Sequence, residues 1–253
     1  MELAETILIT QARTGSTRLP NKVLLKINDN ELLKIQLERL KKCTEVDKII
    51  VATTISENDQ IIVDLCKKWG FDSARGEIHD VLDRFYQAVK DLKPKWVIRV
   101  TSDCPLIDPK IIDSVIALAK VNDVDYASNI LEERFPDGQD VEVIKFTALE
   151  KAWKEATLKS DREHVTLYLR TNCSYKGGKL FTAVNFPCFD DFSKIRMTVD
   201  EQVDFELISH LIEDLGANET WLTYTNHILE NKLSQTNSNI IRNEGLIKSL
   251  KND

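Results

Sequence analysis

Short apolar runs alternate with amphipathic stretches in the first half of the chain. Continuous runs of apolar and β-branched residues predict strands at residues 7–10, 48–54, 71–74 and 96–100. Apolar residues spaced three or four positions apart predict helices between them, at residues 31–43, 57–69, 80–92 and 108–119. Strands that alternate with helices in this order predict an α/β fold with three layers, in which a mostly parallel sheet carries helices on both faces.

The second half of the chain has a less regular pattern. Strands are expected at residues 141–146 and 179–186, and helices at residues 147–156, 161–169, 201–215 and 219–232. A polar stretch, residues 234–243, predicts a loop before a short terminal helix. No segment rich in Gly, Pro or Ser divides the chain, so we expect residues 1–253 to form a single domain.

Composition and charge narrow the range of partners. Hydrophobic side chains make up 42% of the 253 residues and charged ones 30%, and the formal net charge is −7 with a pI near 5.3. An acidic chain has no overall field that attracts nucleic acid or an anionic membrane, so we expect neither as a partner. An anionic ligand must therefore be held by a local cluster of cations.

The cysteines and histidines form no recognisable site in the sequence. The five cysteines are odd in number and include no Cys-x-x-Cys pair, which argues against a disulfide framework and against a cysteine zinc site. The four histidines are scattered, which argues against metal binding by His79, His164, His210 or His227. The chain shows no signal segment and no apolar run near the roughly 20 residues of a membrane span. We therefore expect a protein of the reducing cytoplasm.

A basic loop, residues 10–22, follows the first predicted strand and reads TQARTGSTRLPNK. No acidic residue occurs from Thr6 to Asn28, although the whole chain is acidic. Gly15 and Ser16 predict a tight turn whose amides converge on an anion. The cations of the loop suit phosphate oxygens and come from Arg13, Arg18 and Lys22. A solvated basic loop is the alternative, but the position after an N-terminal strand favours a site for a nucleoside triphosphate.

The loop differs from two familiar phosphate-binding motifs. The Gly-x-x-x-x-Gly-Lys-Ser/Thr pattern and the Gly-x-Gly-x-x-Gly pattern are both absent from the chain. Their absence argues against an ATPase of the P-loop class and against a dinucleotide-dependent dehydrogenase.

Two similar hexapeptides each end in an aspartate. Residues 98–103 read IRVTSD and residues 195–200 read IRMTVD. Each predicts a strand whose Arg, Thr and Asp share one face, and whose Asp reaches the ligand end of the sheet. Two carboxylates that face a triphosphate are typical Mg²⁺ ligands, because this ion prefers oxygen and bridges phosphates. The alternative for Asp103 and Asp200 is a role at a helix N-terminus.

The basic loop resembles the signature loop of sugar nucleotidyltransferases. The resemblance is closest to the cytidylyltransferases that activate sialic acid and Kdo-type sugars, and especially to their SpsF-like relatives of spore-coat polysaccharide synthesis. The segments Asp103-Cys104-Pro105-Leu106 and Thr198-Val199-Asp200 match the metal-binding segments of that family. The resemblance implies a Rossmann-like nucleotidyltransferase fold of the GT-A type, a homodimer, CTP as substrate, and Mg²⁺ held by Asp103 and Asp200.

The resemblance also implies roles for individual side chains. The implied catalytic residues are Arg13 and Lys22, and the implied nucleotide-binding residues are Arg13, Gly15, Ser16, Arg18, Lys22 and Thr101. Three further segments are similar to family segments and imply an acceptor pocket formed by Arg84, Gln139, Glu142, Glu163 and His164. Roughly residues 130–190 would then form a subregion for acceptor binding and oligomerisation. Without the resemblance, an exposed surface pair with Asp83 is the favoured interpretation of Arg84. Glu142 and Glu163 also fit solvated side chains, and His164 fits a helix-surface or core residue.

The resulting hypothesis is a Mg²⁺-dependent cytidylyltransferase that transfers CMP from CTP to a sugar or sugar acid, with release of pyrophosphate, for surface polysaccharide or glycan biosynthesis. Residues 99–105 differ from the sialic acid enzymes, which leaves the base and the acceptor open. The nearest alternative is a GT-A glycosyltransferase that uses a nucleotide sugar, but this class carries an Asp-x-Asp pair where the chain has Thr101-Ser102-Asp103. The loss of metal carboxylates would mark a non-catalytic nucleotide-binding subunit, and both are present.

Overall fold

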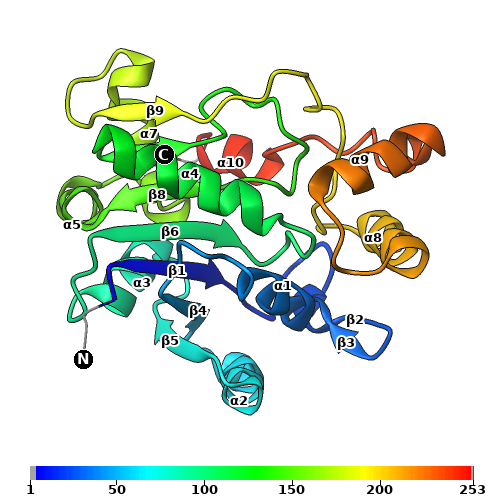
Figure 1. The fold of residues 1–253 in the computed structure, drawn as a ribbon. Helices are drawn as coiled ribbons and strands as arrows, with labels where there is room; N and C mark the ends of the chain where they lie inside the picture. Colours follow the sequence, from blue (N-terminus) through cyan, green and yellow to red (C-terminus); the bar gives the residue numbers. More distant parts are fainter. Residues whose placement is uncertain (1–3, 252) are drawn as a thin grey trace.

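The computed structural model describes residues 4–251 and residue 253. Its centre is a seven-stranded sheet in the order β5-β4-β1-β6-β8-β7-β9 (Figure 1). These strands are β1 (Thr6–Gln11), β4 (Lys48–Thr54), β5 (Asp72–Gly76), β6 (Trp96–Thr101), β7 (Tyr126–Ser128), β8 (Glu142–Lys145) and β9 (Ala183–Asn185). The strands from β5 to β6 pair in parallel, β8 runs antiparallel to both neighbours, and β9 pairs in parallel with β7. The prediction of a mostly parallel sheet is confirmed.

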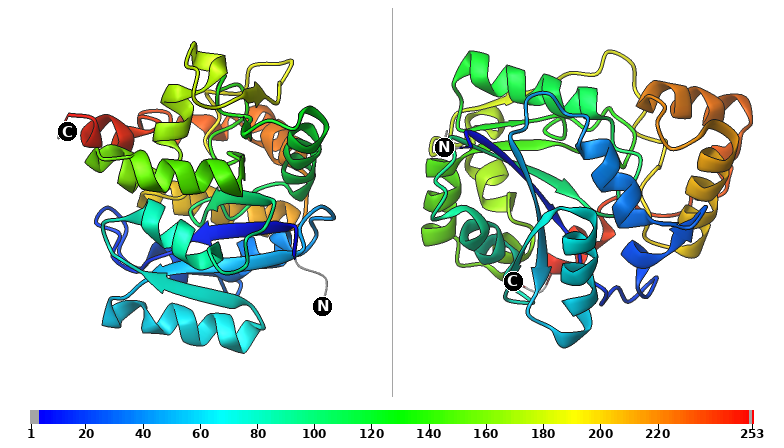
Figure 2. Two further views of the ribbon diagram at one scale, coloured as in Figure 1. Left: turned by 90° about the vertical axis from the view of Figure 1, so that its left-hand side faces the viewer. Right: turned by 60° about the horizontal axis from the view of Figure 1, so that its bottom comes forward.

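Helices cover both faces of this sheet, which gives three layers (Figure 2). The helices are α1 (Leu32–Leu40), α2 (Gln60–Trp69), α3 (Val81–Val89), α4 (Pro109–Asn122), α5 (Phe146–Glu155), α6 (Lys159–Glu163), α7 (Leu167–Asn172), α8 (Gln202–Leu215), α9 (Trp221–Glu230) and α10 (Glu244–Ser249). A small hairpin of β2 (Lys26–Ile27) and β3 (Asn30–Glu31) precedes α1.

The alternation along β1 explains the layers, because successive side chains of a strand point to opposite faces. Leu8 belongs to a core cluster with residues of α1, α2 and α4. Ile7 and Ile9 belong to a second cluster with residues of α3 and α5. A third cluster joins α8 and α9 to the segment around Met197, beyond the carboxyl end of the sheet.

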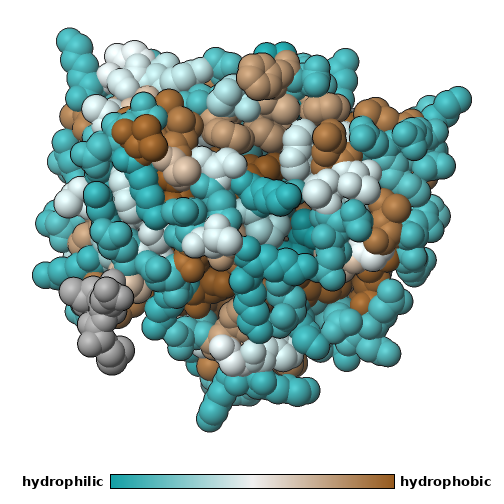
Figure 3. All heavy atoms as spheres, in the orientation of Figure 1, coloured by the Kyte–Doolittle hydropathy of each residue, from teal (hydrophilic) through white to brown (hydrophobic). Residues whose placement is uncertain are grey.

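On the face drawn in Figure 3, hydrophilic residues cover most of the area and apolar residues gather in small groups. Within the described part of the chain, every helix is too short or too polar to cross a membrane.

The second aspartate-bearing hexapeptide is not a strand, contrary to the prediction. Residues 195–199 run outside the sheet and form a single bridge, between Arg196 and Asp137. Their amides pair with loops instead: Met197 N donates to the carbonyl of Asp137 at 2.7 Å and Val199 N to that of Asp103 at 2.7 Å. The apolar alternation that suggested a strand reflects burial of Met197 and Val199 against α8 and α9.

Other elements also differ from the sequence prediction. The helix expected at residues 161–169 is divided into α6 and α7, because Val165 between them has φ +59° and is fully buried. That left-handed conformation is costly for a β-branched residue and cannot continue a helix. The strand expected at residues 179–186 is shorter in the structure, where it forms only β9. The strand β7 was not predicted, because its three residues are too few to show a period of alternation.

Candidate active site

A cleft of about 790 Å³ opens at the carboxyl ends of β1 and β6. This is the position at which parallel α/β sheets bind ligands. Ten of the thirteen residues implied by the resemblance line it: Arg13, Ser16, Arg18, Lys22, Arg84, Thr101, Asp103, Glu163, His164 and Asp200. The other three, Gly15, Gln139 and Glu142, are not among its lining residues.

Lys22 joins the two aspartates at the floor of the cleft. Its Nζ lies 3.1 Å from Oδ2 of Asp103 and 2.8 Å from Oδ1 of Asp200. The three residues come from three separate segments, and the nearest two are 81 positions apart. The structure therefore brings the basic loop and both carboxylates to one point, as the sequence led us to expect.

The charges at this point stabilise one another. Partial burial raises the pKa of Asp103. The Lys22 ammonium and hydrogen bonds from Thr101 and Lys22 lower this pKa by more, and the result is a pKa of about 2. Burial lowers the pKa of Lys22, and the charges of Asp103 and Asp200 outweigh that effect and raise it. At neutral pH the site therefore holds the Lys22 ammonium beside the ionised carboxylate of Asp103.

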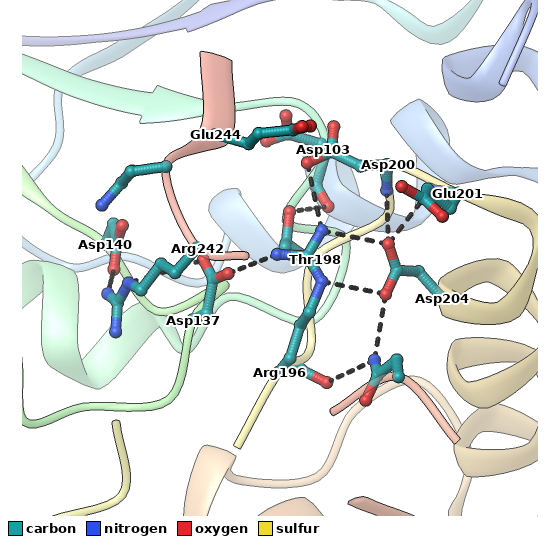
Figure 4. Close-up of polar contacts among 12 residues, drawn as sticks. Asp103, Asp137, Asp140, Arg196, Thr198, Asp200, Glu201, Asp204, Arg242 and Glu244 are labelled. Atoms are coloured by element: carbon teal, nitrogen blue, oxygen red, sulfur yellow. Dashed lines mark hydrogen bonds and ion pairs between the residues drawn. The ribbon is translucent and has the colours of Figure 1, made fainter. Parts of the chain in front are cut away.

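Asp200 has two further cationic partners. Arg18 NH2 lies 3.0 Å from Oδ2 of Asp200, and Arg196 NH2 lies 3.1 Å from the same oxygen. Arg196 also binds both carboxylate oxygens of Asp204, at 2.9 and 3.0 Å, and Oδ2 of Asp137 at 2.6 Å (Figure 4). Burial lowers the pKa of Arg196, but its contacts with Asp204 and Asp137 raise it above the usual value. Arg196 thus fixes the direction of the Asp200 side chain.

The loop that follows β6 and the segment before Asp200 are tied directly. The carbonyl of Asp103 accepts hydrogen bonds from Val199 N at 2.7 Å and from Thr198 Oγ1 at 3.1 Å. Gly138 lies against the same segment with φ +107°, and a Cβ at this position would be 2.7 Å from the carbonyl carbon of Met197. This close approach accounts for the glycine. The two hydrogen bonds to the carbonyl of Asp103 couple the position of that residue to the segment that ends in Asp200.

The basic loop is held by an aspartate that sequence reasoning missed. Oδ1 of Asp59 accepts from the backbone N and the hydroxyl of Thr14, each at 2.7 Å. Arg13, which follows β1, is exposed in the cleft and makes no hydrogen bond or ion pair with any described residue. Its guanidinium is therefore available to a ligand.

The turn at Gly15 differs from the expected anion nest. Among the described residues, the glycines in the left-handed region are Gly70, Gly138, Gly177 and Gly216, so Gly15 does not use the freedom of glycine. The amide of Ser16 donates to the carbonyl of Thr14 at 2.9 Å, which directs it back into the loop. The residues of this loop that line the cleft include the cations Arg13, Arg18 and Lys22.

Two of the implied acceptor residues lie behind the cleft wall. Gln139 is fully buried, where it accepts from Asp108 N at 2.9 Å and donates to the carbonyl of Leu106 at 3.1 Å. Glu142 is buried and pairs with Arg99, which lines the cleft. Both side chains are thus directed into the protein, and a role in supporting the site fits their burial better than the expected direct contact with the acceptor.

The remaining acceptor candidates line the far side of the cleft. Arg84 is buried and donates to the carbonyls of Glu77, at 2.7 and 3.2 Å, and Ile78, at 3.0 Å. The Nε2 atom of His164 is buried and has no partner among the described residues. Burial lowers the pKa of His164, so its ring is neutral at pH 7. A neutral imidazole with an unused nitrogen suits a hydroxyl group of a ligand.

The C-terminal segment reaches the cleft, which the sequence did not indicate. Glu244 of α10 lies 3.4 Å from Arg18, and the hydroxyl of Ser249 donates to Glu163 at 2.6 Å. Arg242 lies 2.8 Å from Asp140 (Figure 4). Burial raises the pKa of Asp140 to about 7, although Arg242 opposes this shift. These residues join the site through contacts in the folded chain, and no local sequence pattern indicates them.

Comparisons with known proteins identify the family of the chain. A family model described as cytidylyltransferase matches residues 7–238. The spore coat polysaccharide biosynthesis protein SpsF of Bacillus subtilis is 34% identical over 216 residues, covering 83% of this chain and 87% of SpsF. An uncharacterized protein of Methanocaldococcus jannaschii is 45% identical over 207 residues, covering 80% of this chain and 81% of its own.

A solved structure has the same fold throughout. A cytidylyltransferase from Leptospira borgpetersenii superposes with a TM-score of 0.86 at 31% identity, covering 94% of this chain and 100% of its own. The family match sets aside both a glycosyltransferase and a non-catalytic subunit. The chain belongs to the cytidylyltransferase family, in its SpsF-like branch, and is a nucleotidyltransferase.

Proposed function

We propose that the protein transfers CMP from CTP to a sugar or sugar acid, with Mg²⁺ as cofactor and pyrophosphate as the second product. This proposal rests on one observation: Lys22 forms ion pairs with both Asp103 and Asp200 at the carboxyl end of the sheet. The name of SpsF, a spore coat polysaccharide biosynthesis protein, supports a product used in surface polysaccharide or glycan synthesis.

The donor set at this point fits Mg²⁺. One oxygen from Asp103 and one from Asp200 lie about 3 Å from the same nitrogen, so both face a common position. Magnesium prefers oxygen ligands and is commonly bound by one or two carboxylates, waters and substrate phosphates. When bound, the ion would neutralise charge that develops on the phosphates during transfer.

The cations of the basic loop account for the rest of the negative charge. A triphosphate that enters the cleft would meet Arg13, which has no competing partner among the described residues. Arg18 and Lys22 would exchange carboxylate partners for phosphate oxygens, and Lys22 would stay charged because its pKa is raised. Positioned charges of this kind supply most of the catalysis in phosphoryl-group chemistry, so no protein nucleophile is needed.

The acceptor would bind on the far side of the cleft. Glu163 and the neutral His164 offer hydrogen-bonding atoms to a polyhydroxylated substrate. Arg84 would contribute through the shape of the 77–79 loop that it holds. An acceptor oxygen would attack the α-phosphorus in line with the departing pyrophosphate.

A screen of pyrophosphate release tests the proposal. Each of the four NTPs is combined with a panel of nonulosonic acids, Kdo-type sugars and sugar phosphates, with and without Mg²⁺. We expect release only with CTP, an acceptor and the metal together. Sugar transfer from a nucleotide sugar without consumption of CTP would refute it, as would release that is indifferent to Mg²⁺.

We also propose a cytoplasmic homodimer. All five cysteines are free and buried, which fits a reducing compartment. The dimer is supported by the family resemblance alone. Sedimentation equilibrium of the purified chain tests it, and a mass that stays at 29.0 kDa at every concentration would contradict it.

A further inference from the structure

Two histidines that do not line the cleft come together with an aspartate on α8 and α9. His210 and Asp214 are one turn apart on α8, and His227 lies on α9. One ligand atom from each lies within 4.8 Å of the other two. The scattered positions of the histidines in the sequence had argued against such a cluster, but the pairing of α8 with α9 brings two of the four into contact.

The distances within this cluster fit a transition-metal site. Oδ2 of Asp214 lies 3.0 Å from Nε2 of His227 and 3.4 Å from Nε2 of His210. Tetrahedral zinc has metal–ligand distances of about 2.0–2.2 Å, which places neighbouring ligand atoms about 3.3–3.5 Å apart. An ion therefore fits among the three atoms with small side-chain movements.

The fold does not require these three side chains for packing. The inner sides of the two helices are buried in one apolar cluster that contains Leu211, Ile212 and Ile228. The cluster side chains stay accessible, with exposed fractions of 53% for His210, 41% for Asp214 and 21% for His227. A fourth position on an ion would therefore be open to water.

From this geometry we propose that His210, Asp214 and His227 form a binding site for a divalent transition metal, with zinc as the physiological candidate. Imidazole nitrogens select zinc and its neighbours over Mg²⁺, which prefers oxygen. The cluster and the aspartates of the cleft would thus bind different ions. Zinc at this position would cross-link α8 to α9 beside their short connection at residues 216–220.

Calorimetric titration with ZnCl₂ tests this proposal on the untagged, full-length chain after treatment with a chelator. Excess Mg²⁺ is present throughout to occupy sites made of oxygen ligands. We expect one zinc per chain and a rise in melting temperature on binding. His210→Ala and His227→Gln should each weaken binding at least about tenfold, and together they should abolish it and the thermal shift.

Matched controls separate this site from other zinc binding. His79→Ala removes an exposed histidine elsewhere, and Asp200→Asn alters the cleft, so both should bind zinc as the wild type does. His227→Gln keeps a hydrogen-bonding group near Asp214, so its melting temperature without zinc should match that of the wild type. Equal zinc affinity in the double variant, or no binding to the wild type, would overturn the proposal.

Discussion

Replacement of Lys22 by alanine is the sharpest test of the residues in the cleft. The change removes an ammonium that is 2.8 and 3.1 Å from two carboxylates and is 13% exposed. Loss of one positioned charge commonly raises a reaction barrier by about 2.7–4 kcal/mol, which slows turnover by about 100-fold to 1,000-fold. We expect at least a hundredfold loss of pyrophosphate release with saturating substrates.

The same change should have a much smaller effect on stability. The pKa of Asp103 falls from the ordinary 3.8 to about 2 in the folded chain, which corresponds to about 2 kcal/mol at neutral pH from all its partners together. Because the folded value is the lower one, this stability is present above pH 4 and is lost as the pH falls toward 2. Lys22 supplies only part of it, so the variant should remain folded at pH 7.

Lys26 provides a matched control for this experiment. Its side chain is 57% exposed, it contacts Glu31 at 3.6 Å, and it does not line the cleft. Lys26→Ala should therefore keep turnover within about twofold of the wild type, because exposed ion pairs contribute little. A folded Lys22→Ala enzyme with more than a third of wild-type turnover would refute the role given to Lys22.

Three further predictions follow from contacts around the cleft. Arg196→Ala should lower the free energy of unfolding by about 3–5 kcal/mol in urea titration, because it leaves the fully buried Asp204 without its cation; a loss below 1 kcal/mol would contradict this. Gly138→Ala should destabilise the fold by more than Gly177→Ala, since both have positive φ but only Gly138 faces a backbone atom within 3 Å; equal melting temperatures would contradict this. Glu244→Gln should lower the KM for CTP by up to about fivefold without changing kcat, because it frees Arg18 from a partly exposed ion pair; an unchanged or higher KM would contradict this.

The first half of the fold was predictable because its signals are local. β1, β4 and β6 are continuous apolar runs, and each is followed by a helix with clear periodicity. Asp80 and Asp108 show why the helix starts were also readable, since each side chain accepts from the backbone of the first turn. Where such signals existed, predicted and observed elements differ by a few residues at their ends.

The rest depended on contacts between distant segments. Residues 195–199 alternate like a strand, yet their hydrogen bonds go to the loops at Asp103 and Asp137, which no local pattern reveals. The same holds for Asp59, which holds the basic loop, and for the C-terminal segment that reaches Arg18. One signal in the sequence did point to part of these contacts. Arg196 and Asp200 lie an even number of positions apart in the hexapeptide, so they were expected to share one face.

The acceptor side shows the limit of motif matching. Glu142 and Gln139 belong to a matched segment, but burial turns both toward the protein. Sequence similarity identifies a segment as part of the site, whereas the direction of each side chain depends on packing around it. Arg99 pairs with Glu142 and lines the cleft, but the sequence motifs did not identify it as a site residue.

Metal binding in the presence of nucleotide tests the central claim most directly. Mn²⁺ serves as a paramagnetic substitute for Mg²⁺, and its binding is followed by electron paramagnetic resonance with CTP present. We expect CTP to add one bound Mn²⁺ per chain, and Asp103→Asn with Asp200→Asn together to weaken that CTP-dependent binding at least about tenfold. Unchanged affinity in the folded double variant would contradict the account.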